Sequence, residues 1–146
     1  MREGLAAWRV TGSKYHVPSR LARAAEAYLV AGQTDDGLRL VHEVIDKTGD
    51  SWLAPELHRL KGELLLKAGR RDEAEECLDQ ALIVAQVQNA RLLELRAAMS
   101  MARLKRDLGK REDARDLLAS IYGWFTEGFD TLDLKEAKVL LNELAV

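Results

Sequence analysis

One pattern occurs three times along the chain and constrains its fold more than any other feature. In each copy a glycine precedes two variable residues, two acids, a glycine or alanine, three further residues and then valine or leucine. The copies are GQTDDGLRLV from Gly32, GRRDEAEECL from Gly69 and GKREDARDLL from Gly109. Their glycines are 37 and 40 residues apart, a spacing typical of proteins built from repeated helix pairs.

The local chemistry of this pattern predicts helical hairpins. Each glycine follows apolar residues at helical spacing, so it is expected to end a helix in the left-handed conformation that costs glycine little. The two acids then lie in the first turn of the next helix, near the positive end of its dipole. The small residue after them, Gly37, Ala74 or Ala114, allows two antiparallel helices to come close.

Composition agrees with one all-α domain. Of the 146 residues 47% are hydrophobic and only 5% aromatic, which is typical of helices packed through aliphatic and small side chains. The net charge of −2 gives no global attraction to nucleic acid or anionic lipid. The single Cys77 excludes an intramolecular disulfide, so a reducing, cytoplasmic location is expected. No apolar run approaches the roughly 20 residues of a membrane span.

The repeat resembles the tetratricopeptide family. That family has a small residue, an aromatic three positions later, a turn glycine four after that, and an alanine five beyond. The matching positions are Ala25, Tyr28, Gly32 and Gly37, then Gly62, Leu65, Gly69 and Ala74, then Ala102, Lys105, Gly109 and Ala114. Lys105 departs from the pattern, because an aromatic is usual there. The resemblance implies a right-handed α-α superhelix.

A narrower resemblance covers nearly the whole chain. ELHRLKGELLL (residues 56–66) and YGWFTEGFDTLDLKEAKVLLNEL (residues 122–144) are similar to the C-terminal repeats of large bacterial signalling proteins. Those proteins carry a nucleotide cyclase or another effector domain, then an ATPase module, then helical repeats. Leu132 stands where such relatives often have proline. The resemblance implies a regulatory role, and it brings no catalytic residue to this chain.

The register divides the single domain, residues 1–146, into five parts. Residues 1–17 are expected to be the second helix of an incomplete repeat, and residues 129–146 a capping helix. The three complete repeats between them are 18–51, 52–89 and 90–128. The expected helices span about 2–14, 18–31, 34–47, 53–68, 71–87, 90–108, 111–125 and a last one to about 145, capped by Asp130 or Thr131.

No catalytic or metal-binding motif occurs, so we expect neither enzymatic activity nor a cofactor. The phosphate-loop, dinucleotide, zinc-protease and serine-hydrolase signatures are all missing. His16, His42 and His58 belong to different helical units, and no two of them have the i, i+4 spacing of metal ligands on one helix face. Cys77 is expected to be a small core residue, and the acidic run from Asp72 to Glu76 a solvated helix start.

The candidate binding site is the groove lined by the first helices of the repeats. Positions at spacings of three and four share one face of each helix. The candidate residues are Glu26, Leu29, Arg59, Glu63, Leu66, Arg96, Met99, Arg103 and Arg106. The arginines could hold a carboxylate or phosphate, and the leucines an apolar anchor. The alternative is that the arginines are solvated or paired with Glu94 and Asp107.

Three functions remain open at this stage. The first is a module that binds a protein or peptide partner and passes the signal to an upstream effector. The second is structural self-association of the parent protein. The third is nucleic-acid binding through residues 91–115, a stretch that contains eight basic and four acidic residues. It ranks last because no aromatic residue lies among them to stack on bases. A homodimer is also expected through the opening helix, where Leu5 and Trp8 lack a packing partner.

Overall fold

The computed structural model describes residues 17–49 and 51–145. Among them are seven α-helices and no strand, which confirms the all-α prediction. The helices are α2 (Val17–Ala31), α3 (Thr34–Thr48), α4 (Ala54–Lys67), α5 (Arg71–Gln88), α6 (Arg91–Asp107), α7 (Arg111–Tyr122) and α8 (Leu132–Leu144). The expected opening helix, with Leu5 and Trp8, lies outside the described residues.

The three glycine turns have the predicted conformation. Gly32, Gly69 and Gly109 have φ angles of 76°, 80° and 80°. After each glycine, the next backbone N–H donates to the carbonyl five residues back, at 2.8–2.9 Å, so that every turn is a Schellman motif. The paired acids lie in the first turns of α3, α5 and α7. Local chemistry therefore closes three hairpins in the same way.

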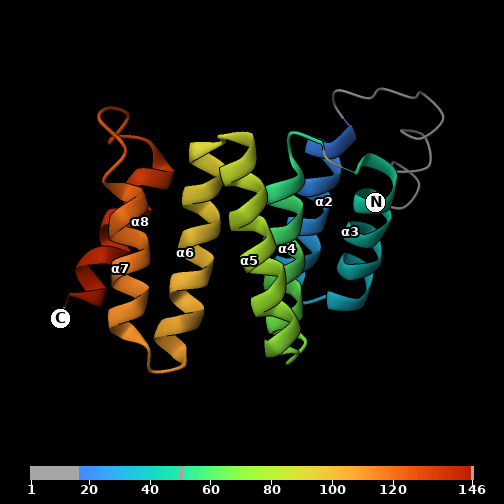
Figure 1. The fold of residues 1–146 in the computed structure, drawn as a ribbon. Coiled ribbons are helices and arrows are strands. Elements are labelled where there is room, and N and C mark those ends of the chain that lie inside the picture. Colours follow the sequence, from blue (N-terminus) through green and yellow to red (C-terminus); the bar gives the residue numbers. More distant parts are fainter. Residues whose placement is uncertain (1–16, 50, 146) are drawn as a thin grey trace.

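The helices pack in a regular order (Figure 1). Each helix contacts the next one along the chain, and α2, α4, α6 and α8 also contact one another in succession. We call these four helices the even-numbered layer. Helices α3, α5 and α7 each pack against two neighbouring members of that layer. The even-numbered layer is therefore continuous from α2 to α8.

Two hydrophobic clusters form the core, and α5 contributes to both. The first joins α2, α3 and α4 with Ala74 at the start of α5. The second joins α6, α7 and α8 with Leu78, Ala81 and Leu82 further along α5. Leu66 packs against both clusters. The two halves of the described chain are therefore joined by buried side chains.

Close helix contacts depend on small residues. Gly37, Ala74 and Ala114 are all buried, as the repeat pattern predicts. A Cβ atom at Gly37 would lie 2.7 Å from Leu64 Cδ2, and one at Gly62 would lie 2.9 Å from Leu78 Cγ and 3.3 Å from the Ala74 carbonyl oxygen. These positions leave no room for a larger side chain.

The C-terminal part differs from the expectation in detail. The seventh helix was predicted to reach residue 125, but α7 ends at Tyr122. Beyond it, the N–H groups of Trp124 and Phe125 donate hydrogen bonds to carbonyls three residues back, so the backbone leaves the α-helical pattern. Thr131 occupies the N-cap position of α8, as one of the two expected caps. Its hydroxyl, however, donates to the Gly128 carbonyl at 2.7 Å instead of accepting a bond from the helix.

Candidate functional site

The even-numbered layer carries all nine candidate groove residues, but their environments differ. Glu26 and Arg96 line one hollow, while Arg103 and Arg106 line another. The side chain of Arg59 is mostly buried, and Glu63 is half-buried. Leu29 and Leu66 are also half-buried and pack against the core. They have less surface to offer an apolar anchor than the sequence suggested.

Met99 was predicted to line the groove, but it is buried in the core. Its side chain is only 3% exposed and belongs to the core cluster formed by α5, α6, α7 and α8. Helix α8 packs on α6, so the side of α6 that was expected to face a ligand is partly covered. Met99 is therefore a packing residue, and of the four candidate residues on α6 only the three arginines remain at the surface.

A buried carboxylate links three helices of the layer. Glu56 of α4 is 5% exposed, and it accepts a short hydrogen bond from Arg59 Nε. Arg96 of α6 places Nη1 2.8 Å from Glu56 Oε2 and Nε 3.6 Å from Asp133 Oδ1 of α8. Arg59 Nη1 also donates to Ser100 Oγ at 3.3 Å. This network ties α4 to α6 and α6 to α8.

The Arg96 contact with Glu56 is an ion pair rather than a well-directed hydrogen bond. Glu56 Oε2 is buried and accepts no hydrogen bond of good geometry, although the Arg96 guanidinium is close. The carboxylate is therefore stabilised mainly by charge at this oxygen. The pairing of an arginine with Glu94, considered as an alternative from the sequence, is not seen among the described residues, where Glu94 accepts from Gln86 Nε2 at 3.0 Å.

The first hollow lies where α2, α4 and α6 meet, and it contains both charge signs. Its volume is about 240 Å³. We call it the mixed-charge hollow, and it is lined by Ala22, Arg23, Glu26, Leu53, Glu56, Leu60 and Arg96. Glu26 and Arg23 are exposed on its rim, whereas Glu56 is held by the arginine network.

The second hollow lies between α6 and α8, and its lining has three basic and two acidic side chains. Its volume is about 410 Å³. We call it the basic hollow, and it is lined by Arg103, Arg106, Lys135, Glu136, Val139, Leu140 and Glu143. Within the described residues, the side chains of Arg103 and Lys135 make no hydrogen bond or ion pair. These two cations are therefore available to an anionic group.

Arg106 is already engaged in the same hollow. Its Nη1 lies 3.2 Å from Glu143 Oε2, and its Nε lies 3.3 Å from Asp107 Oδ1. The second contact agrees with the pairing to Asp107 considered from the sequence. Val139 is 58% exposed beside these charges and supplies an apolar wall. The hollow thus combines two unpaired cations, an engaged arginine and apolar surface.

Helix α8 contributes residues that the sequence reasoning missed. It was expected only to cap the stack, yet it supplies Asp133 to the arginine network and Lys135, Glu136 and Glu143 to the basic hollow. The signal was present in the register, because α8 follows α7 as α6 follows α5. Extending the groove face by one more helix would have included it.

His42, His58 and Cys77 belong to no cluster of metal-binding side chains in the described part of the chain. No group of three or more metal-binding side chains is brought together in residues 17–49 and 51–145, and His16 lies outside them. Burial, with smaller effects from Glu73 and Glu76, raises the pKa of the half-buried Cys77 thiol, while Lys61 opposes this. The thiol therefore stays protonated at neutral pH, as a small core residue would.

Acid is expected to destabilise the fold through His58. Burial and then the nearby Lys61 ammonium lower the pKa of His58 below its usual 6.5. Between the folded pKa of His58 and the unfolded value of 6.5, the unfolded chain binds more protons than the folded chain. The contribution of His58 to stability is therefore fully present above pH 6.5 and is lost as pH falls through the folded pKa. Urea unfolding of wild type and His58→Gln at about pH 7.5 and about pH 5 should show a smaller acid loss in the variant. An equal loss in both proteins would contradict this assignment.

Comparisons of the chain with protein-family models, curated proteins and solved structures found no match. Among the described helices, none is long and apolar enough to cross a membrane. The best-supported site is therefore the even-numbered layer with its two hollows, judged on its own geometry.

Proposed function

We propose that the chain is a non-catalytic protein-interaction module of the tetratricopeptide type, and that the even-numbered layer binds a peptide. In this proposal the helices form a right-handed superhelix with that layer on its concave side. The module belongs to a bacterial signalling protein and reports partner binding to a cyclase or ATPase domain upstream. Three equivalent hairpin turns and an unbroken layer of first helices support this reading.

The observation that carries the proposal is the pair of unpaired cations in the basic hollow. Arg103 and Lys135 come from two helices and line a hollow of about 410 Å³ together with exposed Val139. A guanidinium offers two parallel N–H donors to a carboxylate, and an ammonium adds a point charge. The ligand that fits is a peptide with an acidic side chain next to an aliphatic one.

The carboxylates of the hollow set its selectivity. Glu136 and Glu143 stand beside the cations, and Glu143 already neutralises part of the Arg106 charge. A single carboxylate can approach Arg103 and Lys135, whereas a polyanion such as nucleic acid would also meet these two negative groups. The charge pattern therefore favours an acidic peptide over nucleic acid.

Charge reversal at the two cations tests the proposal. A fluorescein-labelled peptide with a single aspartate next to a leucine is titrated with protein while fluorescence anisotropy is measured. The variant Arg103→Glu/Lys135→Glu should weaken binding by about tenfold or more, because both attractive contacts become repulsive. Circular dichroism should show unchanged helicity.

The matched control is Lys110→Glu/Lys138→Glu, which makes the same change in net charge at two exposed lysines outside the hollow. This variant should bind the peptide within about twofold of wild type, since surface charges at a distance are screened by salt. Equal weakening in both variants would show that only net charge matters. Unchanged binding in the Arg103→Glu/Lys135→Glu variant would refute the assigned site.

A further inference from the structure

One end of the helix stack is unusually apolar. The connections α3–α4, α5–α6 and α7–α8 lie at this end, and the three glycine turns lie at the other (Figure 1). Nine large apolar side chains are exposed among the described residues, and six of them belong to this end. We call these six the apolar edge: Trp52, Val87, Leu92, Trp124, Phe129 and Leu132. Near the glycine turns only Val30 is comparably exposed.

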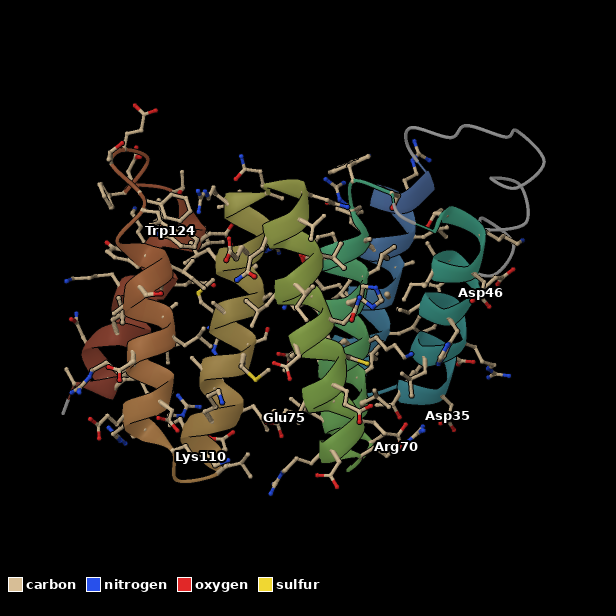
Figure 2. The ribbon with its side chains drawn as sticks, in the orientation of Figure 1. Asp35, Asp46, Arg70, Glu75, Lys110 and Trp124 are labelled. Atoms are coloured by element: carbon tan, nitrogen blue, oxygen red, sulfur yellow. The ribbon has the colours of Figure 1, made fainter. Side chains whose placement is uncertain are left out.

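Two contacts tie neighbouring helix connections together at the apolar edge. Gln88 Nε2 donates to the Ser51 carbonyl at 2.9 Å, which ties the α3–α4 connection to the end of α5. The Arg91 guanidinium carbon lies 4.1 Å from the centre of the Trp124 ring, which ties the start of α6 to the end of α7. Figure 2 shows Trp124 at this end and Arg70 and Lys110, which follow glycine turns, at the opposite one.

The apolar surface of the edge covers part of what one partner buries in an ordinary dimer interface. The six side chains are 44–82% exposed. Even if every one of them presented the roughly 150 Å² of a small aromatic side chain when fully exposed, the six would offer about 500 Å² of apolar surface together. This lies within the about 300–600 Å² of the largest patch on a typical monomer and below the about 800 Å² that each partner buries in a standard interface, so the contact must include the polar surface around the edge.

The charges around the edge suit a partner with the same surface. Arg91 lies near its middle, stacked on Trp124, while Glu127 and Asp130 lie in the α7–α8 connection. Neither acid makes an ion pair or a side-chain hydrogen bond with the described residues. In a two-fold contact of like surfaces, the arginine of one copy can meet the acids of the other.

We propose that the apolar edge is a homodimer interface, in which two copies of the chain pack edge to edge about a two-fold axis. This surface is separate from the peptide-binding face on the even-numbered layer. It also differs from the dimer predicted through Leu5 and Trp8. Peptide binding and dimerisation are therefore expected to be lost through different substitutions.

The test is the concentration dependence of molar mass, measured by light scattering and sedimentation on the full chain. Wild type should form a dimer as concentration rises. The variant Val87→Lys/Leu132→Lys should raise the dimer dissociation constant at least tenfold, because it places four like charges in the apolar contact. Both side chains are mostly exposed, at 82% and 70%, so the monomer should keep its fold.

Two further variants make the outcome specific. Ala27→Lys/Val30→Lys adds the same charge at exposed positions of α2 and should leave the dissociation constant within about twofold. Trp8→Glu should also leave it unchanged. A wild type that stays monomeric at every concentration overturns the proposal. So does a dimer that resists the Val87→Lys/Leu132→Lys change, or one that only Trp8→Glu disperses.

Discussion

The variant Gly62→Leu is expected to lower the free energy of unfolding by about 3 kcal/mol, the upper range for overpacking a core. Gly62 lies in α4 where that helix meets α5, and even a methyl group there would lie 2.9 Å from Leu78 Cγ. Leu78 is fully buried and cannot move aside, and the Ala74 carbonyl oxygen, 3.3 Å away, belongs to the backbone. Chemical denaturation measures the loss.

A control and a rescue separate overpacking from a helix-propensity effect. Ala119→Leu places the same side chain at an exposed position of α7 and should change stability by no more than about 0.5 kcal/mol. The double variant Gly62→Leu/Leu78→Ala should be less destabilised than the sum of the two single variants. The cavity that Leu78→Ala creates can receive the leucine placed at position 62. If the two effects simply added, Gly62 and Leu78 would not share a packing site.

The variant Glu56→Ala is expected to lose about 2 kcal/mol, because removing one member of a buried charge network leaves its partners uncompensated. The side chain of Arg59 is 13% exposed, so its guanidinium cannot regain full hydration. Arg96 is 32% exposed and recovers part of its own hydration, which limits the loss. Urea unfolding of the variant and wild type gives the difference.

The double variant Glu56→Leu/Arg59→Leu tests whether charge or shape is responsible. Replacing both charged groups by apolar ones should be less costly than Glu56→Ala alone, since the more deeply buried Arg59 charge is removed with its partner and Arg96, which is 32% exposed, still has Asp133. Lys47→Ala, which removes an exposed ion pair with Glu43, should change stability by no more than about 0.5 kcal/mol. A larger loss in the double variant than in Glu56→Ala would contradict this account.

The helices and their turns could be predicted because their causes are local. A glycine at the end of an apolar-periodic stretch, followed by two acids, needs only its own neighbours to form a Schellman turn and start a helix. Gly69 illustrates this, with α4 ending at Lys67 and α5 beginning at Arg71. The end of α7 was less predictable, because the side chains after it continue an apolar pattern while the backbone tightens into turns.

The site could be predicted only in part because its details depend on helix rotation and on a distant neighbour. Spacing placed Arg96, Arg103 and Arg106 on one side of α6, and the structure keeps them at or near the surface. The same spacing could not show that α8 would pack against α6, bury Met99 and bring Lys135 beside Arg103. Those facts depend on where a helix about 30 residues further along the chain is placed.

The position of α5 in both hydrophobic clusters has a consequence for folding. In a repeat array, stability is the sum of what each repeat contributes and what each boundary between repeats contributes. Here the boundary between the two clusters runs through one helix, with Ala74 on one side and Leu78 on the other. Unfolding that starts at either end of the helix stack must therefore remove packing from α5 before it can reach the other half. If α5 itself unfolds, both hydrophobic clusters lose buried contacts. Helix α5 thus couples the two halves into one cooperative unit.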